Sequence, residues 1–367
     1  MNRVRQICLN SILAGTLLFF PFYGAQAQGS VSQPATSPEA KAPLQEEMQY
    51  LTASRLVEEE NLLAILWVQR SAEFRGLSYQ AYNLAAMEVD KAVAQRRKEE
   101  KALRKARANT NAASQQNALR PLAVVLDIDD TIVCNAPFEV YCLEHPETKA
   151  DYKAWEQWIA QHNELLPGAR DFMMHADKHG VQVFYVTGRG PQDKDMTARF
   201  LQKAGLPFTD ETHLLMNDRS GSKMKHFAKL ARRYDIICYL GDNAGDFPIG
   251  AIRDENEIKY QKTAEDKSKN DSAGSRSNLK NAEQNDVKIN RPMPLDIPAM
   301  LKHDKNKTRN AIVDARKQDF GTKFILLPNP MYGDWEYNLA QKYRKLPAEQ
   351  RIALRKAAMK RFVCKEK

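Results

Sequence analysis

The fold is decided by the stretch Leu122-Ala123-Val124-Val125-Leu126-Asp127-Ile128-Asp129-Asp130-Thr131, in which a short apolar run ends in acidic residues. Such a run is typical of a buried strand in a parallel sheet. Ligands of these sheets bind at the carboxyl ends of the strands, so the acidic residues lie where a site is expected. Because side chains alternate along a strand, Asp127 and Asp129 share a face and Asp130 does not. Two carboxylates on one face favour a bound cation or a shared proton, although acidic turn residues after an ordinary strand give the same pattern.

Two further apolar runs end in polar residues in the same way. Residues 181–186 precede Thr187, and residues 236–240 precede Asp242. Lys223 lies between these runs, at the start of a helical segment. The chain therefore contains, in order, a strand with aspartates, a strand with a threonine, a helix with a lysine and a strand with more aspartates. One such motif is a weak signal, whereas four in order indicate one shared site.

This order resembles the four motifs of the haloacid dehalogenase superfamily, whose fold is an α/β arrangement with a Rossmann-like parallel sheet. Further segments resemble the bacterial class C acid phosphatases, the lipoprotein-e family of secreted 5′-nucleotidases in subfamily IIIB of that superfamily. The resemblance implies hydrolysis of nucleoside monophosphates and other phosphomonoesters at mildly acidic pH, with Mg²⁺ as the cofactor. The segments that carry it most specifically are residues 67–73, 79–83, 127–135 and 320–336.

The resemblance and the chemistry of phosphate esters together give each acidic residue a role. A phosphomonoester repels a carboxylate nucleophile, and a bound Mg²⁺ reduces this repulsion. We expect Asp127 to attack phosphorus and form an aspartyl-phosphate. We expect Asp129 to protonate the leaving oxygen and then to accept a proton from water. The expected ligands of Mg²⁺ are Asp127, Asp129, Asp242 and Asp246.

Other residues are expected to hold the substrate. The Thr187 hydroxyl is expected to bind phosphate oxygens, and Lys223 is expected to place a positive charge beside the phosphate and the nucleophile. Lys225 is an alternative to Lys223 as the phosphate lysine. Aromatic side chains suit a nucleobase because every base has a face for stacking. The further candidates for substrate binding are Thr131, Arg189, Phe138 and Tyr332.

The amino terminus has the features of a secretory signal peptide. Residues 1–27 combine a basic start, an apolar stretch shorter than the roughly 20 residues of a membrane-spanning helix, and a small-residue cleavage site at 25–27. Cys8 lies inside the apolar stretch and follows no lipobox, so a lipid anchor is not expected. An uncleaved anchor is the alternative. We predict cleavage after Ala27 and a periplasmic or secreted protein without a transmembrane segment.

Composition divides the rest of the chain into parts. Residues 28–45 are rich in Ser, Pro and Ala and predict a disordered linker. Residues 46–118 carry helical periodicity and predict a group of N-terminal helices. The other expected parts are a phosphatase core (119–340) with a cap at about 135–166 and a solvated insertion at about 259–308, and a C-terminal helix (341–367).

The charge of the chain bears on its partners. The formal net charge is +9, and basic residues concentrate at 96–107 and 355–361 without a row of aromatic residues. Glu99 and Glu100 interrupt the first segment, so solvated helix faces are predicted, with attraction of anionic substrates or membranes as the alternative. No nucleic-acid-binding module is recognised, and no nucleic-acid partner is expected. The oligomeric state stays open, with a homodimer as one alternative.

Histidine and cysteine residues carry weaker signals. His175 and His179 lie four residues apart on a predicted helix, a spacing that can present two ligands to a metal ion. No Glu follows His175 and no third ligand is in view, so an ordinary helical pair is favoured over a zinc site. Cys134 and Cys142 are close enough in sequence to pair, whereas Cys238 lies within a predicted strand and is expected to be buried.

The sequence thus predicts an exported, Mg²⁺-dependent phosphomonoesterase with an α/β fold. Its parts are a Rossmann-like parallel sheet of the haloacid dehalogenase type, a small cap and extra N-terminal helices. The predicted partner is a small-molecule phosphomonoester, and the resemblance favours nucleoside 5′-monophosphates. A broad-specificity acid phosphatase or phosphotransferase would share every catalytic residue. A surface binding protein on a phosphatase fold is the alternative from another class, and the complete set of catalytic residue types argues against it.

Overall fold

The computed structural model describes residues 56–57, 59–109, 119–145, 152–161, 164–217, 222–249 and 296–361. All of them belong to one compact unit, Met48–Lys367. The predicted signal peptide (1–27), the predicted linker (28–45) and most of the predicted insertion (259–308) lie outside the described residues.

A five-stranded parallel sheet in the order β3-β2-β1-β4-β5 forms the centre of the fold. The predicted α/β class with a parallel sheet is therefore confirmed. In the register of the sheet, Leu126 of β1 lies opposite Tyr185 of β2 and Leu240 of β4, so the carboxyl ends of these strands meet at one edge. The strands are β1 (Leu122–Leu126), β2 (Gln182–Val186), β3 (Leu214–Leu215), β4 (Asp235–Gly241) and β5 (Phe324–Leu326).

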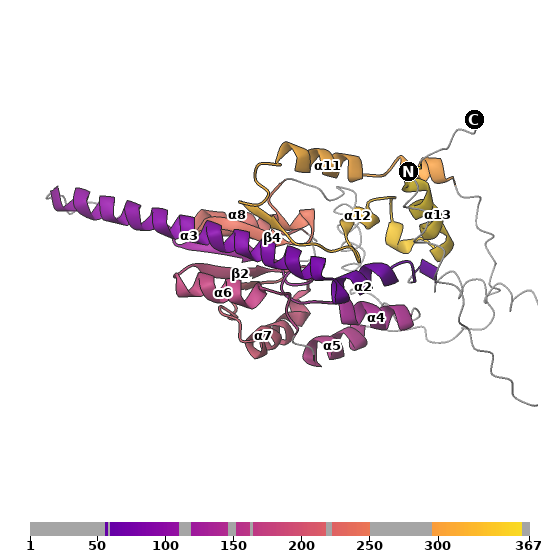
Figure 1. Cartoon of the computed structure of the whole chain (residues 1–367), viewed down its shortest axis with the longest axis horizontal. Helices are drawn as coiled ribbons and strands as arrows, with labels where there is room; N and C mark the ends of the chain where they lie inside the picture. Colours follow the sequence, from indigo (N-terminus) through magenta and orange to yellow (C-terminus); the bar gives the residue numbers. More distant parts are fainter. Residues whose placement is uncertain are drawn as a thin grey trace, which may run out of the picture. The chain divides into compact units, whose positions relative to one another are not determined.

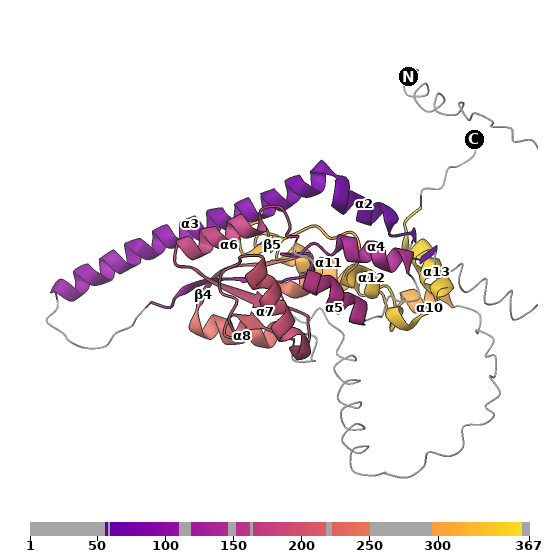
Figure 2. The same ribbon diagram turned by 90° about the horizontal axis from the view of Figure 1, so that it is seen from below.

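Apolar side chains alternate between the two faces of the sheet and bury both. Val124 and Leu126 of β1 belong to one hydrophobic cluster, whereas Ala123 and Val125 belong to another. Helices α3 and α6 cover the first face, and α8 lies on the other side of the strands (Figure 2). α11 adds apolar residues to the second face, and α7 adds residues to the first. The helices are α3 (Ala72–Asn109), α6 (Ala169–Lys178), α7 (Lys194–Lys203), α8 (Met224–Arg233) and α11 (Asn306–Ala315).

Helix α3 packs on the sheet with its first part and then continues past the sheet (Figure 1). The preceding helix, α2 (Leu62–Arg70), is followed by Ser71, whose hydroxyl accepts a hydrogen bond from the Phe74 amide. The buried residues of α3 recur every three or four positions, as expected for one apolar helix face; they are Phe74, Ser78, Ala81, Tyr82, Ala85, Val89 and Val93. Residues 97–106 are mostly exposed, which confirms the solvated basic face that the sequence predicts.

The predicted cap contains two helices, α4 (Ala136–Glu144) and α5 (Tyr152–Gln161). The Phe138 ring of α4 stacks on Tyr141 at a centroid distance of 5.9 Å and contacts Trp158 of α5 at 6.3 Å. Aromatic contacts of this kind hold the two helices together. Trp158 therefore contributes to packing within the cap.

The end of the predicted solvated insertion is instead packed. Within the predicted insertion, the sequence offers anchoring contacts at residues 291–301 alone, and helix α10 (Ile297–Leu301) forms in this stretch; α11 begins before the predicted end of the insertion at 308. Ile297, Met300 and Leu301 are partly buried and pack against the cluster of Tyr343 and Leu354, so this short apolar run is anchored to the fold. The helices that follow are α12 (Asp334–Tyr337) and α13 (Ala348–Ala358), and α13 lies within the predicted C-terminal helix.

Arg355 of α13 connects three parts of the chain. Its guanidinium donates to the Glu336 carboxylate, to the Tyr343 hydroxyl (2.9 Å), to the Val57 carbonyl (3.1 Å) and to Glu60 (2.9 Å). Glu336 is only 7% exposed, and Arg355 supplies the positive charge that pairs with its carboxylate. Arg355→Ala should lower the free energy of unfolding by about 3 kcal/mol, because it leaves a buried carboxylate without its partner. Urea unfolding followed by circular dichroism measures this loss.

Lys356→Ala is the matched control, since Lys356 is the exposed neighbour of Arg355 on the same helix. We expect its free energy of unfolding to stay within about 0.5 kcal/mol of the parent value. Equal losses in the two variants would show that the Arg355 contacts do not stabilise the fold.

The described cysteines test the predicted disulfide pairing and the predicted burial of Cys238. Cys134, Cys142 and Cys238 are buried thiols that form no disulfide, so the suggested pairing of Cys134 with Cys142 is not present. Cys238 has the buried strand position that the sequence predicts.

No helix among the described residues is long and apolar enough to cross a membrane.

Candidate active site

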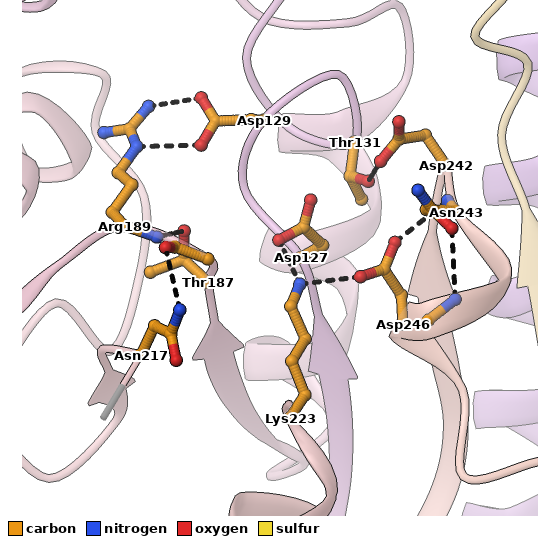
Figure 3. A network of polar contacts seen from close by, with 12 residues as sticks. Asp127, Asp129, Thr131, Thr187, Arg189, Asn217, Lys223, Asp242, Asn243 and Asp246 are labelled. Carbon is orange, nitrogen blue, oxygen red and sulfur yellow. Dashed lines mark hydrogen bonds and ion pairs between the residues drawn. The ribbon is translucent and has the colours of Figure 1, made fainter. Parts of the chain in front are cut away.

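Three buried or half-buried carboxylates meet at the carboxyl edge of the sheet (Figure 3). Asp127 follows β1, Asp242 follows β4, and Asp246 ends a short 3₁₀ turn, Ala244–Asp246. Their ligand atoms all lie within 4.8 Å of one another. The approach of Asp246 to the strand requires Gly241, because a Cβ at this position would lie 2.3 Å from Asp246 Cβ. The structure therefore brings together three of the four predicted metal ligands.

The electrostatics of this group suit a divalent cation. Burial, with a smaller contribution from the neighbouring carboxylates, raises the pKa of Asp127 to about 7, while the charge of Lys223 opposes the shift. Burial and the charges of Asp246 and Asp127 raise the pKa of Asp242 well above its usual value. Carboxylates crowded in a poorly solvated place gain from a cation, and a ligand set of oxygen atoms alone is the set that Mg²⁺ prefers. The residues present therefore fit a hard divalent metal.

Lys223 supplies a positive charge to the same group. It lies at the start of α8, its Nζ contacts the Asp127 carboxylate, and it lies 2.8 Å from Asp246 Oδ1. Although burial alone would lower the pKa of Lys223, the two aspartates raise it above its usual value. Lys225, by contrast, has an exposed side chain one position into α8. This geometry favours Lys223 as the phosphate lysine.

Asp242 is positioned by two neighbours. The Thr131 hydroxyl donates to Oδ1 at 3.4 Å, and the Asn329 side-chain amide donates to Oδ2 at 2.9 Å. Thr131 is fully buried, and its carbonyl also accepts a hydrogen bond from the Tyr82 hydroxyl of α3. Thr131 thus lies within the expected site, where its position favours support of Asp242 over direct contact with substrate.

Asp129 is directed away from the three carboxylates and toward β2 (Figure 3). Arg189 donates to both of its oxygens, from Nε at 2.9 Å and from Nη2 at 2.8 Å, and Asn135 Nδ2 donates at 3.0 Å. Although burial alone would raise the pKa of Asp129, the charge and hydrogen bonds of Arg189 hold it below its usual value. The guanidinium also lies over the Trp155 ring, with Cζ 5.1 Å from the ring centroid. Arg189, predicted to bind substrate, therefore orients the predicted general acid.

Thr187 directly follows β2 beside these groups, as its position in the sequence predicts. Its side chain is fully buried, and its hydroxyl oxygen accepts a hydrogen bond from the Arg189 amide at 3.1 Å. The Asn217 side-chain amide donates to the Gly188 carbonyl at 3.4 Å and supports the same turn. The turn therefore holds Thr187 and Arg189 in one place.

Asp130 occupies a different environment from Asp127 and Asp129. Its backbone is left-handed, with φ of 51°, a conformation that aspartate tolerates better than most residues. Its carboxylate accepts hydrogen bonds from the Tyr332 hydroxyl and from the Asn135 amide. Burial raises the pKa of Asp130 to about 7, while these hydrogen bonds oppose the shift. Asp130 therefore fixes the loop after β1.

The two aromatic candidates lie in different settings. Tyr332 follows β5 and is half-buried, with its hydroxyl held by Asp130 and by Asn135 Nδ2 at 3.3 Å. Phe138 is a half-buried member of the cap cluster. Contact of either ring with a nucleobase stays a prediction.

Several supporting residues were missed by sequence reasoning. Arg309 of α11 donates to Asn243 Oδ1 at 3.2 Å and to Asp334 at 3.1 Å, and so holds the turn that carries Asp246. Asn135 and Asn329 lie inside the quoted motifs, the first directly before α4 and the second three residues after β5, and this placement was the available signal. Arg309 carried no comparable signal, because it comes from a surface-like helix pattern.

The sheet, the strand-end aspartates and the buried lysine define a phosphatase of the haloacid dehalogenase type. The family described as HAD superfamily, subfamily IIIB (acid phosphatase), matches residues 40–335, and the chain belongs to this family. The protein is therefore a phosphomonoesterase, as predicted.

Solved structures of a class C acid phosphatase from Bacillus anthracis are similar to this chain. One is 24% identical, with a TM-score of 0.58, and the match covers 84% of this chain and 99% of that chain. Another, with tungstate bound, is 26% identical with the same TM-score, covering 84% of this chain and 100% of the other. Enzymes of this family use a divalent metal, in agreement with the carboxylate group described above.

Proposed function

We propose that this protein is an exported, Mg²⁺-dependent acid phosphatase that hydrolyses nucleoside 5′-monophosphates and related phosphomonoesters through an aspartyl-phosphate. The observation that carries the proposal is the meeting of Asp127, Asp242 and Asp246 with Lys223 at one edge of the sheet. The similar structure from Bacillus anthracis has tungstate bound, and because tungstate is a tetrahedral oxyanion like phosphate, this supports a phosphate-binding role for the present protein.

In the first step, an Asp127 oxygen attacks phosphorus and the bond to the ester oxygen breaks. Asp129 gives its proton to the departing oxygen, so the alcohol leaves uncharged. Lys223 stabilises the negative charge on the transferred group, and Arg189 holds Asp129 in place. A bound Mg²⁺, held by Asp127, Asp242 and Asp246, would neutralise phosphate charge and polarise phosphorus.

In the second step, the ionised Asp129 accepts a proton from water as the water oxygen attacks phosphorus. The bond between phosphorus and the Asp127 oxygen breaks, so inorganic phosphate is released and both carboxyl groups regain their starting states. The proton that Asp129 loses in the first step is thus recovered in the second.

Export and substrate preference rest on different observations. Export rests on the signal-like residues 1–27. A preference for nucleotides is supported by aromatic rings near the site, since Trp155 stacks on the Arg189 guanidinium that holds Asp129. Phe138 and Tyr332 lie on the two chain segments that follow β1 and β5. A broad-specificity phosphatase would share the carboxylates and lysine and differ only in these rings.

Phosphate release by the purified protein tests the proposal. The substrates are nucleoside 5′-monophosphates, nicotinamide mononucleotide and a simple aryl phosphate, each with Mg²⁺ and with chelator. We expect metal-dependent turnover that favours nucleotides and is lost with chelator. Equal turnover of all substrates would indicate a general phosphatase, and folded protein without turnover would favour the binding-protein alternative.

Arg189 offers a test of the general acid. Arg189→Met should reduce kcat by about tenfold or more, a part of the 10²–10⁴-fold that general acid catalysis contributes. Because Arg189 lowers the pKa of Asp129, its removal should raise that pKa. The activity that depends on protonated Asp129 would then be lost at a higher pH than in the parent. The pH dependence of kcat measures this displacement.

Arg199→Met is the control, because Arg199 has an exposed side chain on α7 and lies outside the site. Its kcat and pH dependence should match those of the parent. An unchanged pH dependence in Arg189→Met would argue against Asp129 as the acid that Arg189 controls.

A further inference from the structure

His175 and His179, which have no third ligand near them along the chain, meet Asp90 in the folded protein. Helix α6 carries His175 and ends with His179 as its C-terminal cap residue, while α3 carries Asp90. The candidate ligand atoms of the three side chains all lie within 4.8 Å of one another. His175 Nε2 lies 2.8 Å from Asp90 Oδ1, and the two imidazole centroids are 4.3 Å apart. Two packed helices therefore direct two imidazoles and a carboxylate at one place.

The hydrogen bonds leave suitable atoms for a cation. His179 Nδ1 lies 2.8 Å from the His175 carbonyl, which can only accept, so Nδ1 carries the proton. The lone pair of the neutral His179 ring is then on Nε2. A backbone carbonyl bound to the second ring nitrogen is a usual arrangement for a metal-ligating histidine. His175 Nε2 and Asp90 Oδ1 lie at hydrogen-bonding distance, at a position where a cation would bind both.

We propose that Asp90, His175 and His179 form a second metal site, for a transition-metal cation such as Zn²⁺. Two imidazoles and one carboxylate are a ligand set that Zn²⁺ accepts, with water in the fourth position. Bonds of about 2.0–2.1 Å in a tetrahedron place neighbouring ligand atoms about 3.3 Å apart, so atoms that lie within 4.8 Å of one another must close by at most about 1.5 Å. The His175 and Asp90 side chains are 31% and 58% exposed and have room for this movement.

This site is distinct from the active site. Helix α6 ends at Lys178 and β2 begins at Gln182, so His179 lies near the amino ends of the parallel strands. The catalytic aspartates lie at the carboxyl ends, and a five-residue strand spans about 16 Å. A cation bound to α3 and α6 would fasten these helices over one face of the sheet. The bound cation should therefore stabilise the folded protein and leave the reaction at the active site unchanged.

Calorimetric titration of the metal-free protein with Zn²⁺, in excess Mg²⁺ to fill the active site, tests the proposal. One Zn²⁺ should bind per chain, and the melting temperature should rise with Zn²⁺ concentration by mass action. His179→Ala keeps the hydrogen bond between His175 and Asp90. It should weaken Zn²⁺ binding by at least about tenfold, a loss that even outer partners of a metal produce. Asp90→Asn is a second variant that should give the same direction of change.

The matched control is His213→Ala. His213 pairs with Asp210 at 2.7 Å, and no group of three metal-ligating side chains that includes it is found among the described residues. Zn²⁺ binding should be unchanged in this variant. Equal Zn²⁺ affinity in the parent and in His179→Ala, or no uptake by the parent, would overturn the proposal. Uptake that persists in His179→Ala and falls as Mg²⁺ is raised would place zinc at the active-site carboxylates and would also overturn it.

Discussion

Replacing Asp127 by asparagine should reduce phosphate release by roughly 10⁴-fold or more, the scale expected when a catalytic nucleophile is removed. An amide has no anionic oxygen with which to attack phosphorus. Asparagine nevertheless keeps the shape of a side chain that is 8% exposed at the end of β1, so the fold should persist. Asp242, Asp246 and Lys223 remain, so metal-supported phosphate binding should be largely retained.

Three measurements separate loss of the nucleophile from loss of structure. Initial rates with an aryl phosphate give turnover, circular dichroism reports folding, and acid quenching during turnover traps phosphate on the parent protein and not on the variant. Asp195→Asn, at an exposed position on α7, is the control and should turn over at the parent rate. Turnover near the parent rate in Asp127→Asn would exclude Asp127 as the nucleophile.

The sheet was predictable because its strands are short apolar runs with clear ends. The runs that end at Leu126, Val186 and Leu240 became β1, β2 and β4, and β5 lies in the short apolar run that ends at Leu327. Strand β3 was not predicted, since two residues, Leu214–Leu215, carry no periodicity. Helix α10 was not predicted because its apolar residues are few and gain their burial from α13, which is distant in sequence.

The site was predictable to the extent that it depends on strand ends. Parallel strands bring their carboxyl ends to one edge, so Asp127, Thr187 and Asp242 had to lie near one another. Side-chain partners were not predictable, because a pair such as Arg189 with Asp129 depends on rotamers and on the cap. The sequence placed both residues near the site and gave no sign that the first would hold the second.

Lys223→Met should reduce kcat by roughly 10²–10³-fold, the loss typical when one preorganised group that stabilises transition-state charge is removed. Lys223 is the positive charge that contacts both Asp127 and Asp246, and its side chain is only 12% exposed. Methionine keeps the length of the side chain and removes the charge. The two carboxylates then lose their counter-charge, so the nucleophile and the transferred phosphate are both less well stabilised.

Lys225→Met separates the two lysines that the sequence left as alternatives. Lys225 is exposed on the same helix, two residues on, so the variant makes the same chemical change in the same element. Its kcat should stay within about twofold of the parent, as expected for a surface substitution away from the site. Steady-state kinetics with saturating Mg²⁺ give both values. A large loss in Lys225→Met with a small loss in Lys223→Met would reverse the assignment, because the charge that acts in turnover would then come from the lysine farther along the helix.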